Sequence, residues 1–370
     1  MIISTIITFI IILGILVFVH ELGHYFAAKK SGMQVEEFGF GFPPRMFGIK
    51  KGETIYSVNW IPIGGFVKIA GEDGGEGSNP RSFANQTFLK RFITLIAGVT
   101  MNIIFAWLVI MIAMGIGLPT VINEGDALPA SAIVDEPFIV FREVLVDSPA
   151  QLAGFKTGDS VKSVNGEQID SLQEVQELTQ LNLGKETKYV VSRGDETIEA
   201  TLTPRVSPPE GQGAMGVSLA TVADVSYPWY EVPFRAVGAT YNVVYSTISA
   251  FGTILGQWFS GESVGGQLSG PVGIAVLTRD VAQLGFIYLL QFTAVLSVNL
   301  AVINAIPFPA LDGGRILFLI IEKIRGRKLP ETAEQVANTL GFGLLLLLMV
   351  FVTIKDFGRF EILQKIGNLF

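Results

Sequence analysis

A long uncharged segment opens the chain and most constrains what it can fold into. Residues 1–19 are apolar apart from three hydroxyl side chains, Ser4, Thr5 and Thr8. Continued to residue 28, the segment exceeds the roughly 20 residues that an apolar helix needs to cross a bilayer. It lacks the basic start and the small-residue cleavage site of a signal peptide. We therefore predict a first transmembrane helix over residues 1–28.

Composition supports a membrane protein. The 370-residue chain is 49% hydrophobic and only 16% charged, and its mean hydropathy is +0.50, which is unusual for a soluble globular protein. A net charge of −7 argues against nucleic acid as a partner. The lack of cysteine excludes disulfides and thiolate metal ligands.

The end of the first predicted helix carries the sequence His20-Glu21-Leu22-Gly23-His24. Two imidazoles at i and i+4 lie on one helix face, where both can bind one metal ion. Glu21 can hold and deprotonate a water molecule beside that metal, an arrangement typical of helix-borne zinc proteases. The chain has two histidines and both lie here, so we favour a metal site over two surface histidines. With no other histidine and no cysteine, the remaining ligand must be a carboxylate or a weaker oxygen donor.

Three further apolar segments, 92–118, 286–306 and 336–354, predict three more transmembrane helices. In the second, Gly98 and Asn102 lie one turn apart, and we interpret them as a close helix contact and an interhelical hydrogen bond. The third runs into Asn304-Ala305-Ile306-Pro307-Phe308-Pro309-Ala310-Leu311-Asp312-Gly313-Gly314, so we assign it residues 286–315. Two prolines break the helix, and irregular backbone at membrane depth requires surrounding protein or a water-filled cavity. Asp312 is therefore our best candidate for the missing carboxylate.

Basic residues predict the orientation in the membrane. Two connections carry the lysine and arginine excess: Lys29, Lys30, Lys50, Lys51, Lys90 and Arg91 in residues 29–91, then Arg315, Lys323, Arg325, Arg327 and Lys328. Both are expected in the cytoplasm, which places both termini outside it. For the histidines to meet Asp312, their two spans must run in the same direction with one return span between them. The mostly apolar residues 228–260 are therefore expected to form an interfacial amphipathic helix rather than a further span.

The connection 29–91 contains two features of its own. Residues 39–43 have the glycine and proline content of a loop, and residues 54–69 predict two strands broken at Pro62 and Gly64-Gly65. An apolar hairpin this close to the membrane either dips into it and offers an edge strand, or is purely structural. The pattern alone leaves both interpretations open.

Residues 123–221 have the composition of a soluble domain. Expected elements are a strand at 141–146, a short helix capped by Ser148 and ending at Gly154, a strand at 160–164, a turn at Asn165-Gly166, a helix at 172–181, and a hairpin at 188–193 and 197–204. Over residues 141–217 this order resembles a PDZ domain of the bacterial permuted type. The resemblance implies a groove that takes an extended peptide by strand addition, with residues 213–217 as a candidate carboxylate-binding loop.

Together, the His20–His24 motif, the proline-rich Asp312 motif and the intervening PDZ-like domain resemble the bacterial site-2 protease family of intramembrane zinc metalloproteases. The resemblance implies one zinc ion bound by His20, His24 and Asp312, with Glu21 as the catalytic base. It also implies substrate contacts from Asn304, Gly39, Phe40, Gly41, Ile63, Gly64, Gly65 and Phe66. Two departures are Val99, where the family's second-span motif leads us to expect proline, and a single PDZ-like domain where some relatives carry two.

Partners and location also follow from the resemblance. Expected substrates are single-span membrane proteins, such as anti-sigma factors or remnant signal peptides, already cut outside the cell by an upstream protease. The expected site is the bacterial cytoplasmic membrane, with the PDZ-like domain and both termini outside and the active site within the bilayer near the cytoplasmic face. The predicted fold is thus a polytopic α-helical membrane protein with four transmembrane helices, an inserted α+β PDZ-like domain and a membrane-associated β-hairpin.

Two alternatives compete with this interpretation. In a membrane-anchored zinc protease with a water-facing site, the third ligand would be Glu36, Glu37 or Glu53 of the cytoplasmic connection. In a non-catalytic membrane adaptor, the PDZ-like domain would carry the function and Glu21 would be dispensable.

Overall fold

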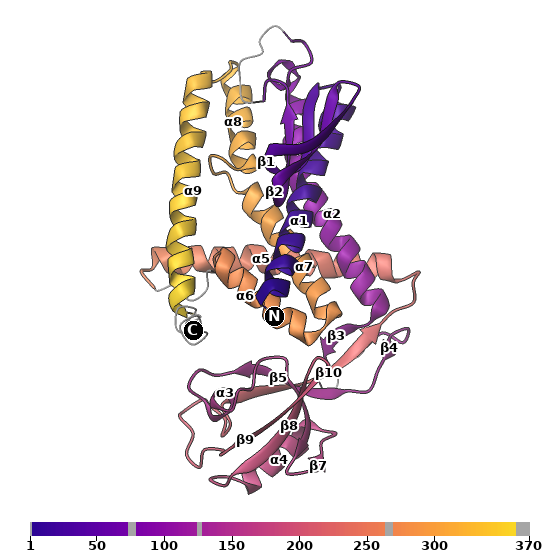
Figure 1. Ribbon diagram of the computed structural model, residues 1–370, viewed down its shortest axis with the longest axis vertical. Helices are drawn as coiled ribbons and strands as arrows, with labels where there is room; N and C mark the ends of the chain where they lie inside the picture. Colours follow the sequence, from indigo (N-terminus) through magenta and orange to yellow (C-terminus); the bar gives the residue numbers. More distant parts are fainter. Residues whose placement is uncertain (1, 73–78, 124–127, 263–268, 360–370) are drawn as a thin grey trace. The chain divides into compact units, whose positions relative to one another are not determined.

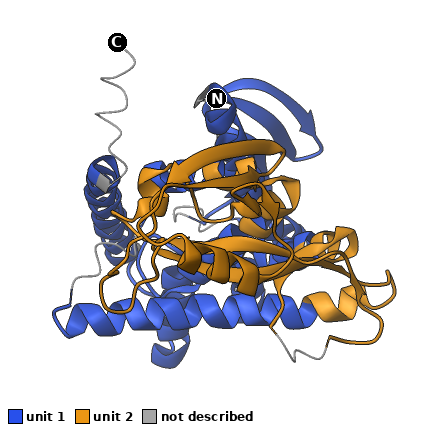
Figure 2. Cartoon of the chain, turned by 90° about the horizontal axis from the view of Figure 1, so that it is seen from below, with its two compact units in different colours: residues 1–109, 237–279, 293–370 blue, residues 110–236, 280–292 orange. Residues whose placement is uncertain are grey.

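The computed structural model describes residues 2–72, 79–123, 128–262 and 269–359 (Figure 1). The glycine-rich residues 72–79 predict a flexible surface loop, and most of them lie outside these ranges. The chain forms two compact units, coloured separately in Figure 2. One contains residues 1–109, 237–279 and 293–370, and the other contains residues 110–236 and 280–292.

Four helices among the described residues are long and apolar enough to cross a membrane, as the sequence predicts. They are α1 (Ile2–Lys30), α2 (Phe88–Ile116), α7 (Phe286–Ala305) and α9 (Glu331–Arg359). Many of their apolar side chains are exposed, including Ile3, Ile112 and Leu347. A surface of this kind is suited to lipid rather than water. The helix α5 (Val232–Phe259) is not among the four.

Strands β1 (Val35–Lys51) and β2 (Thr54–Ile69) form an antiparallel pair beside α1 (Figure 1). Gly39 pairs with both Ser57 and Phe66, so the two halves of β2 flank the first half of β1. The predicted breaks at 39–43 and at Pro62 to Gly65 are present as bends, but they lie within continuous strands. The two halves of β2 pair with β1 and not with each other, so the predicted hairpin within 54–69 is wrong. Gly41 and Gly64 both have φ of +80°, so the backbone bends sharply there without ending the strand. The second half of β2 becomes an outer edge, with which no other described strand pairs.

A six-strand path, β3-β10-β5-β6-β8-β9, organises the PDZ-like domain, with β4 paired to β10 and β7 paired to β6. The strands are β3 (Leu118–Val121), β4 (Ile133–Val134), β5 (Phe138–Val144), β6 (Ser160–Val164), β7 (Glu167–Gln168), β8 (Thr187–Arg193), β9 (Glu196–Leu202) and β10 (Val217–Ser226). The helices are α3 (Pro149–Leu152) and α4 (Leu172–Leu181).

Local signals in this domain are confirmed. The Ser148 side chain accepts a hydrogen bond from the Gln151 amide and caps α3, and α4 has the predicted bounds. Asn165 and Gly166 have φ of +50° and +88°, as a two-residue hairpin turn of this type requires. Strand β10 was not predicted, because its partners β3 and β5 flank it in space but precede it by many residues in sequence.

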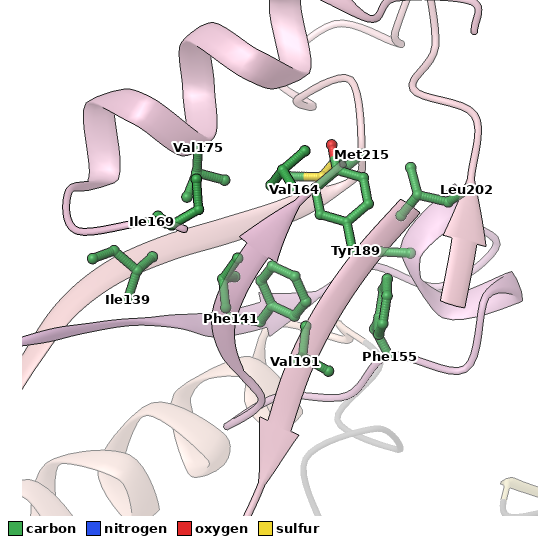
Figure 3. Close-up of a cluster of buried hydrophobic side chains, with 12 residues drawn as sticks. Ile139, Phe141, Phe155, Val164, Ile169, Val175, Tyr189, Val191, Leu202 and Met215 are labelled. Atoms are coloured by element: carbon green, nitrogen blue, oxygen red, sulfur yellow. The ribbon is translucent and has the colours of Figure 1, made fainter. Parts of the chain in front are cut away.

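The core of the domain is apolar and aromatic (Figure 3). Phe141, Phe155 and Tyr189 are almost fully buried in it. The Tyr189 hydroxyl lies 3.0 Å from Thr179 Oγ1, so the one polar end of this side chain is satisfied inside the core.

Two short helices form where the residue pattern predicts irregular structure. The sequence Gly270-Pro271-Val272-Gly273 predicts a turn, but helix α6 (Pro271–Leu284) begins there. Proline suits the first helical position, and the Asp356 carboxylate accepts hydrogen bonds from the Gly270 and Gly273 amides at 2.9 and 2.7 Å. Helix α8 (Asp312–Arg325) occupies the expected basic connection, so α7 ends at Ala305 and not at residue 315. A 3-10 turn, η1 (Phe83–Asn85), precedes α2.

Candidate metal centre

Three side chains from two helices bring ligand atoms to one point. His20 and His24 lie one turn apart on α1, and their Nε2 atoms are 3.2 Å from each other. Asp312, the first residue of α8, places Oδ2 2.9 Å from His20 Nε2 and 3.3 Å from His24 Nε2. Among the described residues, this is the histidine and carboxylate cluster with the spacing of a metal site.

These distances fit zinc. Tetrahedral zinc with ligands at about 2.0–2.1 Å requires ligand atoms about 3.3 Å apart, close to all three edges of the observed triangle. Two imidazole nitrogens face each other, and the carboxylate oxygen is buried without a well-formed hydrogen bond. Buried polar atoms in this arrangement need a shared partner. A cation bound by all three satisfies them together.

Glycines allow the backbone of α8 to approach this point. A Cβ atom on Gly313 would lie 2.2 Å from the Ile306 carbonyl oxygen, and one on Gly314 would lie 2.2 Å from the Phe308 carbonyl oxygen. Since real Cβ atoms do not approach this closely, only glycine lets the chain turn back after Pro307 and start α8 here. The two glycines after Asp312 therefore help to place its carboxylate.

Helix α2 contacts both histidines of the centre. His24 Nδ1 lies 2.8 Å from the Thr94 carbonyl oxygen, and His20 Nδ1 lies 3.3 Å from the side-chain nitrogen of Asn102. A Cβ on Gly98 would lie 2.3 Å from His24 Nε2. The residue pattern predicted Gly98 and Asn102 as helix-packing residues and did not reveal their contact with the histidines. Their spacing of four residues on an apolar helix was the available signal.

Glu21 contacts the β-hairpin. Its Oε2 accepts a hydrogen bond of 3.2 Å from the Val67 backbone amide. Val67 lies in the second half of β2, at the outer edge of the sheet, so this edge lies beside the predicted catalytic base. Asn304 is also near, with its side-chain nitrogen 3.5 Å from His20 Nε2.

The predicted substrate contacts of the hairpin lie against the helix turns that precede His20. Phe40 packs edge-to-face against Phe18, with ring centroids 6.0 Å apart, and a Cβ on Gly64 would lie 2.8 Å from Val17. The remaining predicted positions are Gly39 and Gly41 in β1, and Ile63, Gly65 and Phe66 in β2. Gly65 and Phe66 lie in the second half of β2, at the outer edge, whereas Gly39 lies in the strand beside it. All five remain candidate substrate contacts.

The carboxylates of the water-facing alternative are engaged elsewhere. Glu36 pairs with Lys68 at 2.7 Å, and Glu37 pairs with Arg45. Glu53 lies 2.7 Å from Lys29 and 2.6 Å from Arg81. Hydrogen bonds from these two cations, with that from Arg81 first, lower the pKa of Glu53 to about 2. These contacts favour Asp312 as the third ligand.

Comparison with known proteins identifies the family of this chain. The family model of peptidase family M50 matches residues 8–348. A relative from Clostridium acetobutylicum is 33% identical over 94% of this chain and 95% of its own. The zinc metalloprotease RasP of Geobacillus kaustophilus is 30% identical over 96% of this chain and 98% of its own. The regulator of sigma-W protease RasP of Bacillus subtilis is 30% identical over 97% and 99%, respectively.

A solved PDZ domain of an SdrC-like protein from Listeria monocytogenes is 22% identical, and the match covers 24% of this chain and 90% of that one, with a TM-score of 0.21. A TM-score this low establishes no common fold, so the description of the PDZ-like domain rests on its own strands and helices. The match to the family model and the relatives cover nearly the whole chain, including both metal motifs. The chain therefore belongs to peptidase family M50, the site-2 protease family, and is a zinc metalloprotease.

Proposed function

We propose that this protease cuts its substrates inside the membrane, in the transmembrane segments of single-span proteins. The observation that carries the proposal is the position of the metal triangle. His20 and His24 are 5% and 7% exposed, and they lie within a helix that is apolar enough to span a bilayer. Ionisable groups in such helices are costly and are usually functional.

His20, His24 and Asp312 would hold the zinc ion, which when bound supplies Lewis-acid polarisation of the scissile carbonyl. Glu21 would take a proton from the attacking water while the water oxygen forms its bond to the carbonyl carbon. Glu21 would then give the proton to the amine as the carbon–nitrogen bond breaks. Asn304, close to His20, would orient the substrate backbone by a hydrogen bond.

A transmembrane helix hides its peptide bonds in its own hydrogen bonds, so a substrate must become extended before it is cut. The outer edge of β2 provides a partner for an extended strand. The Val67 amide points from this edge to Glu21, so a strand added here would pass beside the base. Exposed Phe47, Val58 and Trp60 on the hairpin support contact between this sheet and lipid.

Helix α5 supports the proposed four-span orientation. Seven of its exposed large side chains recur at intervals of three, four or seven residues and so share one helix face: Phe234, Val237, Tyr241, Tyr245, Ile248, Leu255 and Phe259. Aromatic and apolar side chains on one face are suited to the membrane interface. With α5 on the surface, the PDZ-like domain and both termini lie outside the cytoplasmic membrane, and the metal centre lies towards its cytoplasmic side.

The name of one relative supports the proposed substrate class. One is named as a regulator of sigma-W, which supports anti-sigma-factor-like substrates here, after an upstream protease has shortened their external part. The PDZ-like domain would then admit short external tails, by binding them or by excluding longer ones.

The test uses the full chain in detergent or vesicles with a single-span reporter. Glu21→Gln is expected to keep one zinc per chain and cut nothing, and Asp312→Ala is expected to lose the metal. Retention of zinc and cleavage by Asp312→Ala would place the ligands in the hairpin region and overturn the proposal. Cleavage of only water-exposed reporter segments would favour the membrane-anchored, water-facing alternative. Normal cleavage by Glu21→Gln would remove Glu21 from the chemistry.

A further inference from the structure

Asn102 has an unusual environment for a buried amide. Its side chain is fully buried in the interior face of α2. Its nitrogen lies 3.3 Å from His20 Nδ1, whereas its side-chain oxygen is buried without a hydrogen-bond partner. An unpaired buried oxygen costs on the order of 1–3 kcal/mol, so this amide requires an explanation.

The position of the proton on the His20 ring explains the environment of Asn102. If Nε2 faces the metal, it must carry a lone pair, and the proton of the neutral imidazole then resides on Nδ1. Nδ1–H is a donor, and so is the amide nitrogen opposite it, so two donors would meet at 3.3 Å. A half-turn of the terminal amide group exchanges two groups of nearly equal size and brings the oxygen to Nδ1. The exchange replaces a contact between two donors by a hydrogen bond from Nδ1–H to the amide oxygen, and the amide nitrogen takes the position that the oxygen leaves.

We infer that Asn102 is a positioning residue whose side-chain oxygen accepts a hydrogen bond from His20 Nδ1–H. The bond fixes the tautomer and ring orientation that direct Nε2 to Asp312 and the zinc ion. The inference rests on the proposed ligand set of His20, His24 and Asp312. Partners of this kind on the second ring nitrogen typically change metal affinity by about 10–100-fold.

The other histidine supports this role for Asn102. His24 Nδ1 already faces an acceptor, the Thr94 carbonyl oxygen, at 2.8 Å. Thr94, Gly98 and Asn102 are spaced by four residues and so lie on one face of α2. Thr94 provides an acceptor for His24, Gly98 leaves space for the imidazole rings, and Asn102 provides the proposed acceptor for His20. The Asn102 backbone is also fixed, because its carbonyl accepts a 2.8 Å hydrogen bond from Ser297 Oγ on α7.

Two substitutions separate this role from helix packing. Asn102→Leu keeps the approximate volume and removes the acceptor, whereas Asn102→Asp keeps an acceptor and removes the donor. We expect Asn102→Leu to weaken zinc binding about 10–100-fold and Asn102→Asp to stay within about threefold of the parent. Asn299→Leu is the matched control, because it removes another interhelical contact, 3.2 Å from Thr247 Oγ1, and should leave zinc affinity unchanged.

The measurement is the zinc dissociation constant of the full chain by chelator competition, together with nitrogen-15 histidine spectra of the zinc-loaded parent. Only two histidines contribute signals, and His20 Nδ1 is expected to be protonated. Parent-like affinity in Asn102→Leu, equal losses in the Leu and Asp variants, or an unprotonated Nδ1 would each overturn the inference. Asp312→Ala is measured alongside: if it retains zinc, the ligand set itself fails, a result distinct from failure of the Asn102 assignment.

Discussion

The core of the PDZ-like domain and the metal centre are both buried, but they are built in opposite ways. In the domain, large side chains such as Phe141 and Tyr189 fill the interior. Around the metal centre, missing side chains create the space: a Cβ on Gly23 would lie 2.4 Å from the Ala97 carbonyl oxygen, and Gly98 leaves room for both imidazole rings.

The two regions also differ in how their buried polar groups are paired. The carboxylate of Asp159 is fully buried in the PDZ-like domain, yet it is paired with Arg193 at 2.6 Å. In the metal centre, the Asp312 and Asn102 oxygens are buried without a conventional partner. The PDZ-like core is complete as folded, whereas the proposed zinc ligands include a buried Asp312 oxygen that a cation would satisfy. Stability should therefore depend on volume in the first region and on backbone clearance in the second.

The largest effect is expected from Gly98→Ala. The added methyl group would meet His24 Nε2 at 2.3 Å, so either the ring or helix α2 must move. A displacement of about 1 Å at a catalytic group can cost about a hundredfold in rate, and we expect at least this loss in reporter cleavage, with weaker zinc binding. Gly115→Ala in the same helix is the control, because nothing lies within 4 Å of its Cβ position. Equal activity of the two variants would contradict the role of backbone clearance.

The next effect concerns volume in the PDZ-like core. Phe141→Ala should lower the free energy of unfolding of this domain by about 3–5 kcal/mol, because it removes a fully buried ring and leaves a cavity. Hydrogen exchange of peptides from β5, β6 and β8 would measure the loss. Leu152→Ala, at an 80% exposed position, should change little. Zinc content should be unaffected by Phe141→Ala, and loss of zinc would show that the two regions are not independent in stability.

The smallest effect concerns the ion pairs that tie the β1–β2 turn to the end of α1. The pKa of Glu53 is lowered to about 2, so this carboxylate stabilises the fold above its ordinary pKa near 4.5, and the contribution disappears as pH falls towards 2. Hydrogen exchange of hairpin peptides, corrected for intrinsic rates, should show a constant difference between Glu53→Gln and the parent from pH 8 to 5. This difference in hydrogen exchange between the variant and the parent should decrease below about pH 4.

Glu36→Gln is the control for this experiment. Its partner Lys68 is largely exposed, and exposed pairs contribute little to stability. If the difference in hydrogen exchange between Glu53→Gln and the parent did not change with pH, the stability of the hairpin would not depend on the Glu53 charge.

Much of the fold was predictable because its signals are local. The four apolar helices, the cap at Ser148, the turn at Asn165-Gly166 and helix α4 each depend on residues close in sequence. The strands β1 and β10 were not predictable in the same way. Their partners are set by bends at glycines and by contacts with distant segments, and neither follows from the residue pattern of the strand itself.

The same distinction between local signals and contacts of distant segments holds for the metal centre. The chain by itself determined the ligand types, since it has two histidines at helical spacing, no cysteine and one carboxylate after a proline-broken span. Only the tertiary structure decided which backbone surrounds those ligands: Thr94, Gly98 and Asn102 behind the histidines, and Val67 beside Glu21. The physical reason is that ligand chemistry belongs to single side chains, whereas clearance and hydrogen bonding depend on how closely separate helices and strands approach one another.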